Sequence, residues 1–184
     1  MAKASDTNRI GYKELKAELR KGVNRALYVL YGEESFLIDK LVGSIRELIL
    51  APGSESFDSV TFSGNAASRL SLDRLRSELM TPPFLSRCKL IVVRGSGFFS
   101  AFVQKTTGSA ETGSEGAAPA ATSAKGRQPE LLQLIEQMPD SACLIFVEEK
   151  VDRRQKALIQ AIEKKGVLAE IGQEQPALLR QWVE

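Results

Sequence analysis

Five short apolar runs in the sequence alternate with segments whose apolar residues recur at helical spacing. The run 59–63 alternates apolar and polar residues, as a half-exposed strand does. The first, third and fourth runs are continuously apolar, which is typical of strands buried on both faces of a parallel sheet. The sequence therefore predicts strands at 25–31, 59–63, 89–93, 142–147 and 167–171.

The segments between these runs supply the helices that a parallel sheet requires. Strands that alternate with helices indicate an α/β domain, in which ligands normally bind at the carboxyl ends of the strands. We therefore expect function in the loops after Tyr31, Val93 and Val147. The predicted helices are 13–20, 36–50, one that Ser71 caps, 129–138, and one that runs from an Asp152 cap to 165.

Two segments depart from this alternation. In 105–128, 18 of 24 residues are Gly, Ala, Ser, Thr or Pro, and none is large and apolar. Such a segment cannot bury enough surface to offset the entropy lost on ordering, so it is predicted to be a disordered insertion. A helical pattern in 174–184 stops just after Trp182, without a cap. We therefore expect a longer natural chain, truncated here.

Composition narrows the possible functions. The 184 residues are 43% hydrophobic and 26% charged, which is typical of one globular domain. Histidine is absent, which excludes Ser-His-Asp and Cys-His catalysis and removes the commonest zinc ligand. Cys88 and Cys143 lie in or beside apolar runs, so buried thiols are expected. With no transmembrane or signal segment apparent, a cytoplasmic protein is expected.

The turn after the first strand is where a nucleotide-binding α/β protein carries its phosphate loop. Here Gly32 is followed by Glu33 and Glu34, and no Gly-Lys-Ser/Thr occurs in the chain. Two carboxylates at a helix N-terminus would repel a triphosphate. The sequence therefore predicts no ATP site and no cofactor at this turn.

Charged residues after the fourth run allow two alternative functions. Glu148 and Glu149 imitate a magnesium-binding acidic pair, which would suit a nucleotide phosphate-handling enzyme, although two solvated carboxylates are the simpler interpretation. Basic residues that could contact DNA phosphates follow, but a solvated helix face is favoured over a DNA-binding module because the net charge is only +2. This basic cluster consists of Lys150, Arg153, Arg154 and Lys156.

The segment 80–87 is the most distinctive in the chain. Pro82 and Pro83 end a helix and stiffen the backbone, and Phe84 and Leu85 follow outside any periodic pattern. Bulky apolar residues on a stiff turn are suited to entering a partner's pocket. The alternative is that Phe84 folds back onto the core.

Three motifs together resemble the delta subunit of bacterial DNA polymerase III. They are YVLYGEESFLID at 28–39, TPPFLSR with the strand KLIVV at 81–93, and FVEEKVDRR at 146–154. The resemblance implies an AAA+-like (P-loop NTPase-like) five-stranded parallel sheet flanked by helices, without a functional phosphate loop. It also implies that 1–173 is a clamp-binding domain and that 174–184 begins a second, helical domain.

The resemblance further implies a role in DNA replication. In this family the delta subunit inserts bulky apolar residues into a pocket of the ring-shaped sliding clamp, the beta subunit, and helps to open it. The matching positions here are Pro83 and Phe84, or Phe84 and Leu85, with Met80 or Thr81 in support. The implied partners are the clamp and the tau/gamma and delta prime subunits, with DNA met only in the assembled complex and no membrane. Such a subunit performs no chemistry, although the complex has DNA-directed DNA polymerase (nucleotidyltransferase) activity.

Overall fold

Five parallel strands form one sheet in the computed structural model, which describes residues 10–64, 67, 70–99 and 124–172. The strand order is β2-β3-β4-β1-β5, and every neighbouring pair is parallel. Each strand lies within two residues of its predicted bounds, so the predicted five-stranded α/β sheet is confirmed. The strands are β1 Leu27–Tyr31, β2 Ser59–Phe62, β3 Lys89–Arg94, β4 Ala142–Glu148 and β5 Gly166–Glu170.

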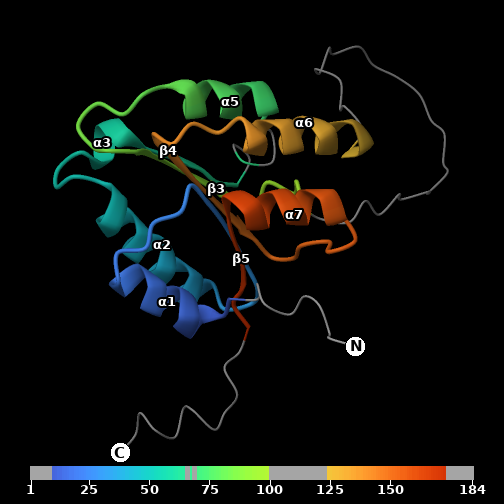
Figure 1. The fold of residues 1–184 in the computed structure, drawn as a ribbon, viewed down its shortest axis with the longest axis horizontal. Coiled ribbons are helices and arrows are strands. Elements are labelled where there is room, and N and C mark those ends of the chain that lie inside the picture. Colours follow the sequence, from blue (N-terminus) through green and yellow to red (C-terminus); the bar gives the residue numbers. More distant parts are fainter. Residues whose placement is uncertain (1–9, 65–66, 68–69, 100–123, 173–184) are drawn as a thin grey trace, which may run out of the picture.

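Helices cover both faces of the sheet (Figure 1). Of the helices within the described residues, two pack on one face and three on the other, and a single-turn helix, α3, stands at the start of β2. The first face carries α1 Tyr12–Arg20 and α2 Ser35–Ile49; the second carries α5 Leu72–Met80, α6 Ala124–Glu136 and α7 Lys156–Lys165; α3 is Glu55–Asp58.

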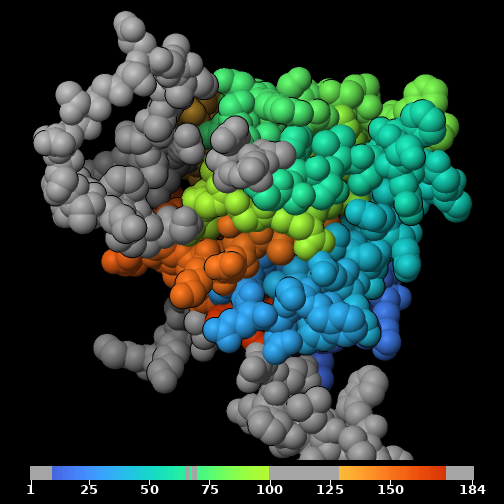
Figure 2. All heavy atoms as spheres, turned by 180° about the vertical axis from the view of Figure 1, so that it is seen from behind, coloured from blue at the N-terminus to red at the C-terminus, as the bar shows by residue number. Residues whose placement is uncertain are grey.

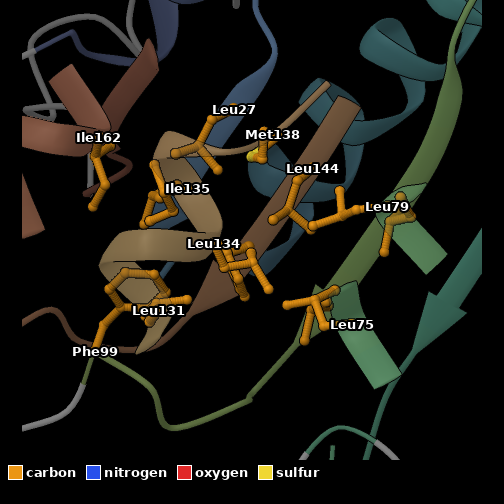
Figure 3. Packing of buried hydrophobic residues seen from close by; sticks show 14 of the residues in the cluster. Leu27, Leu75, Leu79, Phe99, Leu131, Leu134, Ile135, Met138, Leu144 and Ile162 are labelled. Atoms are coloured by element: carbon orange, nitrogen blue, oxygen red, sulfur yellow. The ribbon is translucent and has the colours of Figure 1, made fainter. Parts of the chain in front are cut away.

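The side chains of each central strand alternate between the two cores. In β1, Leu27 and Val29 pack under α5, α6 and α7, whereas Tyr28 and Leu30 pack under α1 and α2. Figure 3 shows the first of these cores, with leucines of α5 and α6 meeting Leu144 of β4. Burial on both faces explains why these strands are continuously apolar, since each buried Leu, Val or Ile contributes about 1.5–3 kcal/mol.

Two helix starts differ from the prediction. The N-cap of α7 is Gln155, not Asp152, because the Asp152 carboxylate accepts hydrogen bonds from Arg154 N and Nε at 3.0 Å in the preceding turn. Helix α6 begins at Ala124, so 124–128 are helical rather than part of an insertion. The rest of the predicted insertion up to 123 and the tail 174–184 lie outside the described residues. The Ser71 cap is confirmed, since its Oγ accepts from Arg74 N.

The two cysteines and the helix lengths can also be compared with the sequence. Cys88 and Cys143 are both free and buried, as predicted. Over the ranges that the structure describes, no helix is long and apolar enough to cross a bilayer.

The junction between α7 and β5 depends on a glycine. Gly166 caps α7 and begins β5, where it pairs with Leu27 of β1. A Cβ at position 166 would lie 1.8 Å from the Leu27 carbonyl oxygen, well inside contact distance. The backbone of β1 therefore leaves no room for any side chain here.

We predict opposite effects for two glycine-to-alanine substitutions. Gly166→Ala should lower the free energy of unfolding by about 3 kcal/mol or more, because the methyl group overlaps the β1 backbone. Gly43→Ala, inside α2 and with nothing near its Cβ position, should raise it by about 0.5–1 kcal/mol. Denaturant unfolding of both variants checks this, and equal stability of the two would contradict the described packing.

Candidate functional site

Large apolar side chains lie exposed where α3 meets the turn between α5 and β3. Phe84 is 77% exposed and Leu85 is 55% exposed, and both stand on the turn between α5 and β3. Phe57 of α3 is 62% exposed, and Met80 ends α5 at 52%. The ribbon and the space-filling view from behind both place α3 and this turn side by side (Figures 1 and 2). The alternative in which Phe84 folds back onto the core is therefore wrong.

The carboxylate of Asp58 holds the turn through its backbone. Oδ1 accepts from Phe84 N at 2.5 Å, and Oδ2 accepts from Leu85 N at 2.9 Å and from Ser86 N at 2.5 Å. Asp58 itself has no exposed surface. Three consecutive amides on one buried carboxylate fix the backbone of the turn, because each is a charge-assisted hydrogen bond.

The hydrogen bonds also determine the protonation of Asp58. Its burial alone would raise the carboxyl pKa, but the three amides and Ser86 stabilise the ionised form and lower the pKa to about 2. The carboxylate is therefore ionised at neutral pH. Only the ionised carboxylate can accept all three hydrogen bonds, because a protonated carboxyl would place its own O–H donor against the donating amides.

Two further contacts close the base of the turn. The Ser86 hydroxyl accepts from Ala51 N at 2.9 Å and lies 2.6 Å from the hydroxyl of Ser54. The buried Lys89 at the start of β3 pairs with Glu78 of α5 at 2.8 Å. The turn is thus bonded to the segment that precedes α3. The ion pair between Lys89 and Glu78 joins the start of β3 to α5, the two elements that the turn connects.

The exposed rings of Phe57 and Phe84 contact each other. Their centroids are 5.8 Å apart and their planes are inclined by 42°. Aromatic pairs at this separation gain about 0.5–1.5 kcal/mol beyond area burial. Two exposed rings therefore form one apolar surface from segments 27 positions apart in the sequence.

The predicted site residues take different positions around this turn. Phe84, Leu85 and Met80 are exposed, whereas Pro83 is half-buried. Thr81 is exposed, and its hydroxyl donates to the Ser77 carbonyl. Sequence analysis missed Phe57 and Asp58. The only signal in the sequence was an aromatic and an acidic residue between Gly53 and the second strand, and it did not specify a partner.

Half of the basic cluster is paired within the chain. Arg153 donates a hydrogen bond to Tyr31 Oη and forms an ion pair with the Glu170 carboxylate at 2.9 Å. Arg154 forms an ion pair with Asp152 at 3.0 Å. Lys150 and Lys156 are exposed and have no ion pair among the described residues. All four cations are exposed, but the charges of the two arginines are offset by carboxylates of the chain itself.

Glu148 is not the solvated carboxylate that the simpler interpretation predicted. It is buried and accepts from the amides of Ser96 and Gly97 at 3.0 and 3.3 Å, and from the Ser96 hydroxyl. Its burial raises the carboxyl pKa, which these hydrogen bonds oppose. Glu148 thus fastens the turn after β3, while Glu149 points into solvent as an exposed residue. Over the described ranges, no group of three or more acidic or cysteine side chains could hold a metal ion.

The turn after β1 is closed by backbone contacts. A Cβ on Gly32 would lie 2.1 Å from the Ile171 carbonyl oxygen, and Ile171 N donates to the Tyr31 carbonyl at 2.7 Å. Glu34 stands at the N-cap of α2. The position at which a phosphate loop would bind a nucleotide thus carries a tight turn and negative charge.

Comparisons with known proteins agree with the motifs. Residues 28–113 match the family model of the DNA polymerase III delta subunit. The Bacillus subtilis DNA clamp loader delta protein has the same fold, with a TM-score of 0.70 and 19% identity over 93% of this chain and 45% of its own. A DNA polymerase III gamma subunit-related protein from Thermotoga maritima is more distant, with a TM-score of 0.48 and 14% identity over 92% of this chain and 48% of its own.

The chain thus spans less than half the length of these two solved structures. No curated protein matches it in sequence. The family match covers both the turn after β1 and the turn that carries Phe84, and the fold of a clamp loader delta protein extends over nearly the whole chain. The predicted resemblance is confirmed: residues 28–113 of this chain match the family model of the DNA polymerase III delta subunit, and the chain has the fold of a clamp loader delta protein.

Proposed function

We propose that this chain is the clamp-binding part of a clamp-loader delta subunit, and that the turn bearing Phe84 and Leu85 enters a pocket on the sliding clamp. One observation carries the proposal. Phe84 and Leu85 are adjacent in the chain and both exposed, and the buried Asp58 carboxylate fixes the backbone of the turn that carries them. Such a turn is preordered before it meets a partner, which lowers the entropy lost on binding.

The work of this turn is binding rather than chemistry. Burial of a Phe and a Leu in a pocket contributes about 3–6 kcal/mol. A differential binding energy of about 5.5 kcal/mol is enough to move a two-state equilibrium from 1:99 to 99:1. The turn biases a clamp toward its open form, without any reaction on this chain, by the part of this burial energy that only the open clamp's pocket provides.

ATP dependence of such a loader would come from its other subunits. The negative turn after β1 does not suit a nucleotide, as described above. Any nucleotide response would come from the partner subunits, the tau/gamma and delta prime subunits being the implied partners, and DNA would be met within the assembled complex. The internal pairing of Arg153 and Arg154 gives no support to a separate DNA-binding function.

Affinity for the sliding clamp tests the proposal directly. A Phe84→Ala/Leu85→Ala variant should bind the sliding clamp of the same organism at least 30-fold more weakly than the wild type in calorimetry, which corresponds to the hot-spot threshold of about 2 kcal/mol. A Leu85→Ala variant separates the two possible pairs, since it weakens binding strongly only if Phe84 and Leu85 form the inserted pair.

The control for this measurement is Phe36→Ala. Phe36 is 64% exposed but lies at the first turn of α2, on another part of the surface. Its loss should leave clamp affinity unchanged. Equal binding by wild type and the Phe84→Ala/Leu85→Ala variant would place the contact elsewhere, and absence of binding by the folded wild type would exclude the proposed function.

The second prediction concerns Asp58 and pH. Because the folded-state pKa is about 2, below its ordinary value of 3.8, the carboxylate stabilises the folded chain above about pH 4. That stabilisation is lost as the pH falls from about 4 to 2. Asp58→Asn should therefore lower the unfolding midpoint at pH 7, and its difference from wild type should shrink through that window.

Unfolding midpoints measured from pH 7 to pH 2 check the prediction. The matched control is Glu55→Gln, which removes an exposed carboxylate from the same short helix and should follow the wild-type curve. A constant difference between Asp58→Asn and wild type at all pH values would show that the charge of Asp58 does not hold the turn.

A further inference from the structure

We infer that Phe57 makes a second contact with the clamp, so that the clamp-binding surface is built from two chain segments and not from the turn alone. This inference rests on the proposed function. It concerns a residue that neither the motifs nor the family resemblance single out. The supporting observations are the exposure of Phe57, its ring contact with Phe84, and the rigid link between the two segments.

The exposure of Phe57 is not explained by packing in the chain. Its ring is 62% exposed, although it is adjacent in sequence to the fully buried Asp58. A single-turn helix could direct this side chain inward or carry a polar residue here at no cost to the core. A large apolar patch that stays exposed in a folded domain commonly marks a site of protein–protein contact.

The sheet holds Phe57 and Phe84 in one place. Strands β2 and β3 are parallel neighbours in which Ser59 pairs with Leu90, so the segments that precede them emerge at the same end of the sheet. Phe57 stands two residues before Ser59. The hydrogen bonds that the Asp58 carboxylate accepts from amides of the turn then join the two segments directly. The two segments that carry the rings are therefore held in a fixed arrangement relative to each other.

This geometry makes Phe57 part of any contact that Phe84 makes. The ring centroids are 5.8 Å apart, close to the separation of directly packed rings. When Phe84 enters an apolar pocket, Phe57 comes to the rim of that pocket. Exposed apolar area on its ring is then removed from water, which favours binding. The occupant of this surface is thus the same apolar clamp pocket and its rim.

A second exposed phenylalanine shows the contrast. Phe36 is as exposed as Phe57, but Lys40 Nζ lies over its ring at 4.6 Å from the centroid. A cation on the ring face is a favourable arrangement in water and would have to be displaced by an apolar partner. Phe36 lies in the first turn of α2, a helix about 22 Å long, and α3 follows the other end of that helix. Phe36→Ala is therefore the matched control.

The test is a double-mutant cycle measured by calorimetry with the sliding clamp of the same organism. The variants are Phe57→Ala, Phe84→Leu and the two combined, since leucine at position 84 keeps an apolar side chain and measurable binding. Phe57→Ala should weaken binding about tenfold, Phe36→Ala should not, and Phe57→Ala should still weaken binding several-fold in the Phe84→Leu background. If Phe57 only supports the Phe84 ring, its loss has no effect in that background, which would overturn the inference.

A direct readout of burial accompanies the cycle. Phe57→Trp in a Trp182→Phe background places the chain's one tryptophan at position 57. Addition of the clamp should shift its emission to shorter wavelength and reduce quenching by acrylamide, whereas an unchanged spectrum in a complex shown to form would overturn the inference. Trp182→Phe alone supplies the background signal of the clamp.

The outcomes separate the inference from the proposed function. If wild type does not bind, or if Phe84→Ala/Leu85→Ala binds normally, the proposed function fails and the second contact fails with it. If the variants at positions 84 and 85 lose affinity while Phe57→Ala binds as wild type does, the proposed function stands and only the second contact is wrong. Unchanged unfolding midpoints confirm that the variants are folded.

Discussion

A parallel sheet imposes one constraint on which the rest of this molecule depends: all five strands begin at the same end. The loops that lead into β2 and β3 must therefore arrive side by side, however far apart they are in the sequence. Asp58 ends one of these loops and the turn before β3 is the other, so a single buried carboxylate reaches three amides 26 to 28 positions away. The exposed apolar surface exists because the sheet brings these two loops together.

The opposite end of the sheet is closed by the chain itself. α/β domains usually bind ligands at the carboxyl ends of their strands, and sequence analysis directed attention to the loops there. In this chain Gly32 meets the backbone of Ile171, and Glu148 fastens the turn after β3. Arg153 bonds Tyr31 and Glu170 across the ends of β1 and β5. The end that serves nucleotides in related architectures is thus used for structure, and the proposed binding occurs at the amino end.

The sequence predicted those parts of the fold that follow from local periodicity. Continuous apolar runs identified strands buried on both faces, and their bounds are correct to within two residues. It could not predict Phe57 as part of the site, because its contact with Phe84 depends on strand order rather than on spacing. The burial of Glu148 and the local hydrogen bonds of Asp152 were missed for the same reason, since a carboxylate after a strand or before a helix has the same pattern whether it faces water or an amide.

The way in which the turn is held leaves its side chains free for binding. The backbone amides that donate to Asp58 begin at Phe84, so Pro83 can precede them although proline has no N–H to donate. Because the hydrogen bonds at 84 and 85 involve the backbone alone, the side chains at these two positions can change without loss of the turn's shape. The shape of the turn depends instead on the charged acceptor at position 58, because its carboxylate binds the three amides of the turn.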